Sequence, residues 1–172
     1  TDQILQSFGA LLRLARIEAQ APPGQEARVD LAKLVDDAVE LYAPIAAERQ
    51  ITLEARTSPA QTQGDADQLF QLLVNLMDNA IKFAPPASVV EIALQRVGQD
   101  IELDVADRGS GIPESDRERV FDRFERLEDH RASPGTGLGL SLARAIVLRH
   151  QGRIALLDNA PGLRVRVTFR SP

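Results

Sequence analysis

The segment that most limits the possible folds of this chain is a strongly apolar stretch at residues 66–83. Its apolar side chains recur at three- and four-residue steps, the period of an α-helix; they are Leu69, Leu72, Leu73, Leu76, Ala80 and Ile81. Asp65 or Asp67 can cap the start of this helix, and Pro85-Pro86 ends it. A helix that is apolar on most sides has to be buried, so the rest of the chain must cover it.

The remaining segments alternate between helical and extended periodicity. Further helices are predicted near residues 1–20, 30–48 and 138–150, and strands near 28–30, 51–55, 88–97, 100–107, 153–158 and 163–169. The inward side chains of the helix at 30–48 are expected to be Leu31, Leu34, Val35, Ala38, Leu41 and Tyr42. This mixture predicts the α+β class, a two-layer sandwich in which about three helices cover one face of a mixed β-sheet.

A short linker at residues 21–24 ends a leading helical segment (residues 1–24) and precedes a domain at residues 25–172. The leading helix is either a terminal helix that packs on its own domain or half of a helical hairpin that dimerises. Because the chain does not begin with Met, we expect it to be a fragment. Its net charge of -5 argues against a nucleic-acid partner, which would need a basic face.

The helix at 66–83 also carries a polar stripe. Gln71, Asn75, Asn79 and Lys82 follow one another along one side of it. Carboxamide oxygens are neutral, hard ligands that suit a magnesium ion bound to substrate phosphates, and a lysine can meet a phosphate directly. The alternative is an amphipathic helix whose polar side is simply hydrated.

The strand at 101–107 has an apolar face that ends in a carboxylate. Ile101, Leu103, Val105 and Asp107 share this face because side chains alternate along a strand. A buried carboxylate needs N–H donors, and the amino group of adenine is one. The glycines of the following turn allow the backbone to approach a flat ring. The alternative is an aspartate that only caps a turn.

Two further segments have features of a phosphate site. Residues 135–140 read Gly-Thr-Gly-Leu-Gly-Leu and run into a helix, whose free N–H groups and dipole favour anions. Phe121 and Phe124 can anchor a mobile segment, while Arg123 and Arg126 can reach phosphate oxygens. The alternatives are a flexible loop before a helix and a short amphipathic helix with solvated arginines.

Taken in order, four segments resemble the N, G1, F and G2 boxes of sensor histidine kinases. These segments are residues 75–83, 107–112, 121–124 and 135–140. The resemblance extends from about Arg28 to the end of the chain, and residues 11–18 are similar to the end of the second dimerisation helix in that family. It implies the Bergerat ATP-binding fold, which is shared with gyrase, the Hsp90 chaperones and MutL.

The resemblance also implies roles for individual residues. Asp107 would bind the adenine amino group, Asn75 and Asn79 would lie at Mg²⁺, and Lys82 and Arg123 would handle the phosphates of ATP. Catalytic roles fall to Asn75, Lys82 and Arg123. The other residues implied at the nucleotide are Phe83, Gly109, Gly111, Ile112, Phe121, Gly135, Thr136, Gly137, Leu138, Gly139 and Leu140.

One position differs from the ATPase relatives of this fold. Gyrase-like and Hsp90-like members carry a glutamate general base where this chain has Asn75, and an amide cannot accept a proton near neutral pH. Rapid hydrolysis is therefore disfavoured. The family's phosphate acceptor is a histidine followed by an acidic residue, but His130 precedes Arg131 and His150 precedes Gln151. We expect the fragment to bind MgATP without phosphorylating itself.

The function implied is transfer of the γ-phosphate of MgATP to a histidine on a dimerisation domain outside this fragment, for relay to the receiver domain of a response regulator. The resemblance implies a homodimeric parent in the bacterial inner membrane, with this domain in the cytoplasm. One alternative is a degenerate kinase that only binds nucleotide, which would carry a damaged box. The other is a serine kinase of the anti-sigma type, which the dimerisation-like leading helix disfavours.

Overall fold

A computed structural model describes residues 27–126 and 137–172, together with Ile4, Leu5, Phe8, Gly9, Leu11, Leu12, Ala15 and Glu18 of the leading segment. The elements in chain order are β1 (Arg28–Asp30), α2 (Leu31–Glu48), β2 (Thr52–Thr57), β3 (Gln61–Gln63), α3 (Ala66–Phe83), β4 (Val89–Val97), β5 (Asp100–Ala106), the 3-10 turns η1 (Glu114–Asp116) and η2 (Arg119–Phe121), α4 (Gly139–Arg149), β6 (Arg153–Asp158) and β7 (Leu163–Arg170).

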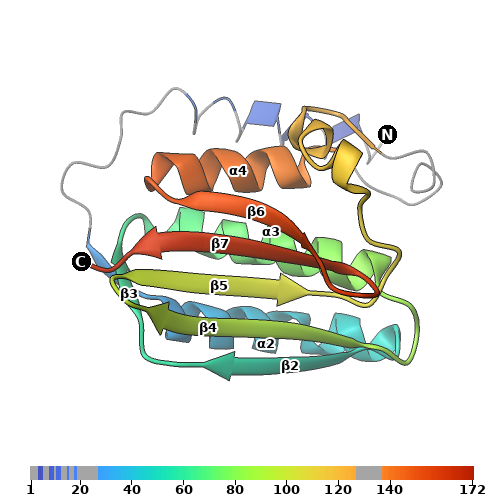
Figure 1. The fold of residues 1–172 in the computed structure, drawn as a ribbon, viewed down its shortest axis with the longest axis horizontal. Helices are drawn as coiled ribbons and strands as arrows, with labels where there is room; N and C mark the ends of the chain where they lie inside the picture. The colour runs from blue at the N-terminus through green and yellow to red at the C-terminus, as the bar shows by residue number, and fades with distance from the viewer. Residues whose placement is uncertain are drawn as a thin grey trace.

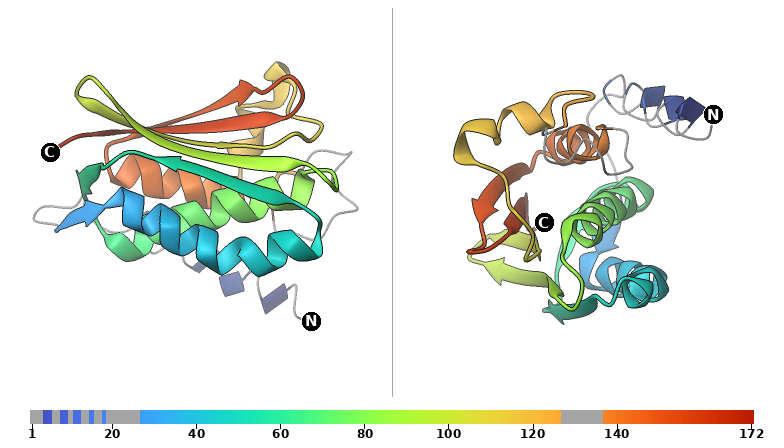
Figure 2. Two further views of the ribbon diagram at one scale, coloured as in Figure 1. Left: turned by 90° about the horizontal axis from the view of Figure 1, so that it is seen from below. Right: turned by 90° about the vertical axis from the view of Figure 1, so that its right-hand side faces the viewer.

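These elements form two layers, with the helices on one face of the sheet (Figure 1, Figure 2). The five-stranded sheet has the order β2-β4-β5-β7-β6. The β2–β4 pair is parallel and the other pairs are antiparallel, so the sheet is mixed. β1 and β3 form a separate antiparallel pair. The predicted α+β sandwich is therefore confirmed.

Helix α3 lies between α2 and α4 and contacts both. Its N-cap is Asp65, whose side chain accepts hydrogen bonds from the backbone N–H groups of Asp67 and Gln68, and it ends at Phe83 before the two prolines. The predicted apolar side is buried, and Met77 joins it with no exposed surface. Burying a leucine-sized side chain contributes roughly 1.5–3 kcal/mol, so this helix anchors the helical layer.

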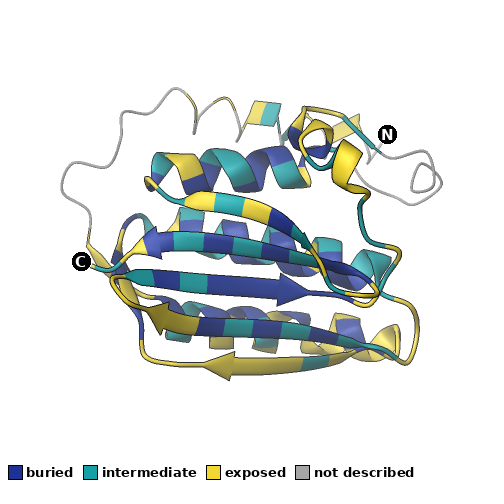
Figure 3. Cartoon of the chain, viewed as in Figure 1, coloured by how far each residue is buried: buried dark blue, intermediate teal, exposed yellow. Residues whose placement is uncertain are grey.

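The inner face of the sheet supplies the other half of the core. Leu94 of β4, Leu103 of β5 and Val167 of β7 are paired in register across three strands and are fully buried. The alternation of buried and partly exposed residues along these strands is visible in Figure 3. Because Ile101, Leu103 and Val105 all face the helices, the period of two carries Asp107 inward at the end of β5.

In the first half of the chain, one strand was not predicted and one expectation is wrong. Strand β3 lacks an alternating apolar pattern, and it forms because it pairs with β1; its central Thr62 is buried and donates to the carbonyl of Arg170. Leu41 of α2 is exposed rather than inward, because Ala38, Tyr42 and Ala46 already occupy the buried stripe at four-residue steps. Among the residues that the structure describes, no helix has the length and apolarity to cross a bilayer.

Candidate functional site

A partly open cavity of about 150 Å³ lies between α3, the end of β5 and the start of α4. The second half of helix α3 lines one side, and the end of β5 with the turn after it contributes Asp107, Ser110, Gly111 and Ile112. The residues that line the cavity are Asn75, Asp78, Asn79, Lys82, Phe83, Asp107, Ser110, Gly111, Ile112, Val120, Glu125, Arg126, Gly137, Gly139, Leu140 and Leu163. Segments that are far apart in the sequence thus meet at one site.

Asp107 is the most deeply placed acid of this cavity, with 4% of its surface exposed. Its Oδ1 accepts hydrogen bonds from the backbone N–H groups of Gly109 (2.8 Å) and Leu163 (3.3 Å). Its own N–H donates to the carbonyl of Leu163 at 2.9 Å. Because Oδ1 serves two backbone donors, the carboxylate has a fixed orientation at the cavity wall.

Gly109 belongs to the same turn but does not line the cavity. A Cβ at this position would overlap the carbonyl oxygen of Phe83, so the glycine lets the turn after β5 lie against the end of α3. Gly111 and Ile112, by contrast, form part of the cavity wall. The turn therefore has one glycine that packs two elements together and one that lines the site.

The polar stripe of α3 faces the cavity through Asn75, Asn79 and Lys82. Gln71 lies one turn earlier and donates from Nε2 to Oδ1 of Asn75 at 3.0 Å. The Nδ2 atom of Asn75 is buried and has no hydrogen-bond partner, a state that costs about 1–3 kcal/mol. This orphaned atom indicates that the site is completed by a polar ligand, because buried polar groups in proteins are almost always paired.

Lys82 and Arg126 give the cavity two positive charges. Burial lowers the pKa of the Lys82 ammonium group, and Arg126 lowers it further, while Asp78 opposes both effects. The Lys82 Nζ also lies 5.1 Å from the centre of the Phe83 ring. Two cations that share a half-buried site repel each other, and an anionic ligand would relieve this repulsion.

Arg123 does not line the cavity. Its guanidinium group forms an ion pair with Glu18 of the leading segment, and its side chain is about half exposed. The residue pattern predicts that Arg123 and Arg126 can both reach phosphates, and the resemblance implies Arg123. Of the two, the structure places only Arg126 at the cavity wall.

The two phenylalanines of this motif differ in environment. Phe121 is buried, and the Arg144 guanidinium lies 5.0 Å from its ring centre, so it anchors the segment on α4 without lining the cavity. Phe124 is 54% exposed and has a positive φ of 62°. The expected anchoring is therefore carried by Phe121 alone, with Val120 beside it at the cavity wall.

The described part of the glycine-rich loop lies at the cavity. Gly137, Gly139 and Leu140 line it, whereas Leu138 points into the core and is fully buried. The Gly137 carbonyl accepts a hydrogen bond from the N–H of Phe124 at 3.0 Å. Gly137 has a φ of +71°, and a Cβ there would lie 2.9 Å from the Phe124 backbone, so the contact requires glycine. Gly135 and Thr136 lie outside the described residues.

Several cavity residues were not predicted: Asp78, Ser110, Val120, Glu125 and Leu163. Helical spacing could have found Asp78, which is three residues from Asn75 on the same side of α3. Leu163 comes from β7, and only the strand pairing places it beside Asp107. Among the described residues, no group of three or more His, Asp or Glu side chains has the arrangement of a metal site.

Residues 64–172 match the family described as histidine kinase-, DNA gyrase B-, and HSP90-like ATPase. The chain is 37% identical over 162 residues to the signal transduction histidine-protein kinase/phosphatase MprB of Mycobacterium sp. strain KMS, an alignment that covers 94% of this chain and 31% of the relative. The chain thus spans about a third of the length of the curated relatives it matches.

Solved structures of histidine kinases are also similar to this chain. The mycobacterial sensor histidine kinase MprB superposes with a TM-score of 0.76 and 31% identity, covering 86% of this chain and 98% of that one. Full-length ShkA in complex with AMPPNP gives a TM-score of 0.85 and 26% identity over 99% of this chain and 37% of that one.

The chain therefore belongs to the histidine kinase-, DNA gyrase B-, and HSP90-like ATPase family. Within this family it is an ATP-binding catalytic domain of the sensor histidine kinase type, as the likeness to MprB in both sequence and structure shows.

Proposed function

We propose that this domain holds MgATP in the cavity beside α3 and transfers the γ-phosphate to a histidine on a dimerisation domain. The observation that carries the proposal is the convergence of a buried acid, two carboxamides and two cations on one cavity: Asp107, Asn75, Asn79, Lys82 and Arg126. The buried acid suits a purine amino group. The carboxamides suit a divalent cation, and the two cations suit a triphosphate.

The adenine would bind at the Asp107 end of the cavity. The carboxylate would accept a hydrogen bond from the 6-amino group of adenine, while Oδ1 still accepts those from the N–H groups of Gly109 and Leu163. Ile112, Leu163 and Val120 supply apolar surface for the faces of the ring. ShkA, which shares this fold, was crystallised with the ATP analogue AMPPNP, and this supports a nucleotide at the site.

The triphosphate would lie toward the start of α4. Lys82 and Arg126 balance its charge, and the backbone around Gly137 and Gly139 meets it at the N-terminal end of the helix. Asn75 and Asn79 are the residues that would hold Mg²⁺, through their carboxamide oxygens, and the orphaned Nδ2 of Asn75 would donate a hydrogen bond to a phosphate oxygen. When bound, the ion would neutralise charge on the phosphate oxygens during transfer.

The residues of the cavity favour transfer over hydrolysis. Asn75 cannot act as a general base, because a carboxamide has no basic site near neutral pH. Glu125 lines the cavity but its carboxylate is paired with Arg119 at 3.1 Å. Catalysis would then rest on orientation of the γ-phosphate and on charge neutralisation by Lys82 and Arg126.

The acceptor would lie on another domain. His150 is buried: its Nε2 accepts a hydrogen bond from the N–H of Asp65 (3.1 Å), and its Nδ1 lies 2.8 Å from the carbonyl oxygen of Ile146. A histidine held in this way at the joint of α3 and α4 is unsuited to accept a phosphate. His130 lies outside the described residues.

The relatives of this chain support a longer parent protein with further domains and a response regulator as partner. The MprB relatives are named signal transduction histidine-protein kinase/phosphatase, and this chain matches about a third of their length. The rest of such a parent would supply the dimerisation domain that carries the acceptor histidine and would pass the phosphate to a response regulator receiver domain. The catalytic domain would lie on the cytoplasmic side of the bacterial inner membrane.

A phosphotransfer assay with γ-labelled ATP tests this proposal. The chain alone should remain unlabelled, and addition of the parent's dimerisation domain should give an acid-labile, base-stable label on that domain. A variant of the dimerisation domain without its histidine is the control. Acid-stable label, or no transfer by a chain that binds MgATP, would contradict the assignment as a histidine kinase.

A further inference from the structure

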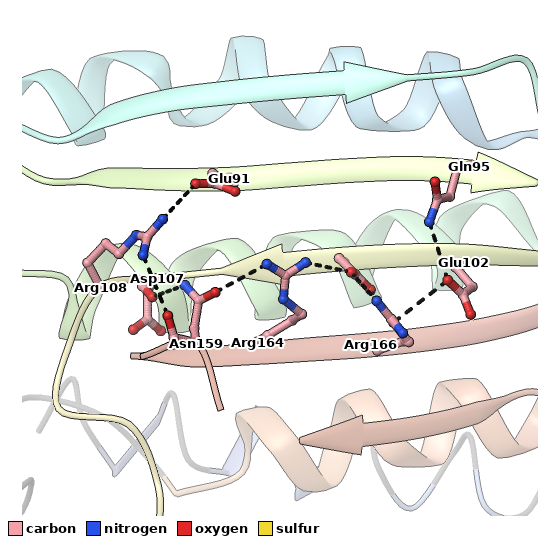
Figure 4. A network of polar contacts seen from close by, with 9 residues as sticks. Glu91, Gln95, Glu102, Asp107, Arg108, Asn159, Arg164 and Arg166 are labelled. Carbon is pink, nitrogen blue, oxygen red and sulfur yellow. Dashed lines mark hydrogen bonds and ion pairs between the residues drawn. The ribbon is translucent and has the colours of Figure 1, made fainter. Parts of the chain in front are cut away.

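The sheet face opposite the helices carries a polar network that extends to Asp107 (Figure 4). Its centre is Asp104 of β5, which is 5% exposed although it lies on this outer face. Arg166 of β7 contacts both carboxylate oxygens, from Nε to Oδ1 at 2.9 Å and from Nη2 to Oδ2 at 2.8 Å. Arg164 adds a third hydrogen bond to Oδ2 at 2.9 Å.

These contacts fix the charge and position of Asp104. Burial alone would raise its pKa, but the hydrogen bonds from Arg166 and Arg164 outweigh burial and hold the pKa below its ordinary value of 3.8. The carboxylate is therefore ionised at neutral pH and holds both guanidinium groups in place. The bidentate pair with Arg166 fixes the carboxylate, and Arg164 is oriented by two contacts, from Nη1 to Asp104 and from Nη2 to Asn159.

From Arg164 the network continues around the edge of the sheet. Its Nη2 donates to Oδ1 of Asn159 at 3.2 Å, and Asn159 in turn donates from Nδ2 to the backbone carbonyl of Asp107 at 2.7 Å. Arg108 also donates to the backbone carbonyl of Asn159 at 3.5 Å. Figure 4 shows these side chains running from β7 to the end of β5.

Asp107 lies just beyond the regular β5–β7 pairing, which ends at Ala106 and Arg164. One further backbone hydrogen bond, from the Asp107 N–H to the Leu163 carbonyl, holds its amide side. Its carbonyl side faces the turn that joins β6 and β7, where a Cβ at Gly162, which has a φ of +110°, would overlap the Asp107 carbonyl oxygen. Only a glycine there lets the turn approach closely enough for Asn159 to reach that carbonyl.

We propose that Asn159, oriented by Arg164, is a positioning residue for adenine selectivity, through the backbone of Asp107. This inference rests on the proposed binding of the adenine amino group by the Asp107 carboxylate. ATP presents a 6-amino donor to a carboxylate, whereas inosine triphosphate (ITP) presents a 6-oxo acceptor, so the ratio of their affinities reports how firmly the carboxylate is held.

The test is calorimetric titration of the chain with MgATP and with MgITP. Asn159→Ala should weaken ATP binding by about three- to tenfold, the range for loss of one neutral hydrogen bond, and leave ITP binding within about twofold. The ATP-to-ITP preference should fall accordingly. Arg164→Met, which removes the donor that orients Asn159, should shift the preference in the same direction by a smaller factor.

Gln95→Ala is the matched control, since Gln95 lies on the same sheet face and bonds only to Glu102 among the contacts of this network (3.4 Å). It should leave the preference unchanged. A general loss of folded protein would lower both affinities together, so it cannot imitate a change in the ratio. If Asn159→Ala does not fold, Arg164→Met carries the test alone.

An unchanged ATP-to-ITP preference in the folded variants would overturn the role of Asn159 and Arg164. Asp107→Asn separates this outcome from failure of the proposed function. If Asp107→Asn abolishes the preference while the Asn159 and Arg164 variants keep it, only the positioning role is wrong. If Asp107→Asn also keeps it, the adenine assignment itself is wrong.

Discussion

The ammonium group of Lys82 and the guanidinium group of Arg126 line the same cavity, and Arg126 contributes to lowering the Lys82 pKa. Burial is the larger cause, and Asp78 acts in the opposite direction. The phosphates of ATP would bring negative charge to both cations, so Lys82 and Arg126 connect the cavity to its proposed ligand.

The first prediction compares the two arginines of the segment after η2. Arg126→Ala should weaken MgATP binding by about tenfold or more, because a charge-assisted hydrogen bond contributes roughly 1.5–3 kcal/mol. Arg123→Ala should leave binding within about twofold, since its guanidinium is engaged with Glu18 away from the cavity. Calorimetry measures the MgATP affinity of both variants. A larger loss of affinity in Arg123→Ala than in Arg126→Ala would show that Arg123 is the arginine that binds the phosphates.

The second prediction concerns the charge of Lys82. In the folded protein its ammonium group should lose its proton at a pH below the ordinary value of 10.5, because burial and Arg126 disfavour the charged form. Bound nucleotide should raise this pKa by adding negative charge. By linkage, nucleotide then binds more tightly below the pKa and more weakly above it.

An NMR titration of carbon-labelled lysine measures the Lys82 pKa directly. Lys33 and Lys82 are the lysines of this chain, so the spectrum has few signals and Lys82→Met assigns them. A Lys82 signal that titrates at or above 10.5 without ligand, or that does not move when ADP is added, would contradict the charge argument.

The third prediction concerns Tyr42, the single tyrosine of the chain. Burial, and to a smaller extent the charge of Asp78, raises the pKa of its phenol from 10.0 to about 12. The folded state therefore favours the neutral phenol. The stability that this group contributes is present below pH 10 and is lost as the pH rises through about 12.

Phenolate absorbance follows this titration without interference, because the chain has no tryptophan. The folded chain should ionise near pH 12, together with loss of helical circular dichroism, and the chain in urea should ionise near 10. Reversible ionisation near pH 10 in the folded chain would show that the Tyr42 phenol is not buried.

The sequence predicts those parts of the site that lie within one element. The polar stripe of α3 and the inward Asp107 follow from helical and strand periods alone, and Asp65 was one of two candidate caps. These features depend on local periodicity, which a single sequence contains. The two-layer arrangement follows as well, because apolar helices and strands have to cover one another.

The parts that were missed depend on contacts between elements. Phe124 has a left-handed backbone, which is rare outside glycine, and this turn separates Arg123 from Arg126 so that only the latter lines the cavity. The pairing of Asp104 with Arg164 and Arg166 depends on the register of β5 against β7. A shift of two residues would keep the apolar face inward but would separate these side chains, and the period of two does not distinguish such registers.

The central claim is that the Asp107 carboxylate binds adenine, and Asp107→Asn tests it most directly. The two backbone N–H groups at Oδ1 would retain the amide oxygen, so the new NH₂ group would face the 6-amino group of adenine as a second donor. In calorimetry with MgATP, the account predicts that affinity falls by about a hundredfold or more while thermal unfolding stays cooperative. A folded Asp107→Asn chain that binds MgATP as tightly as the unaltered chain would contradict it.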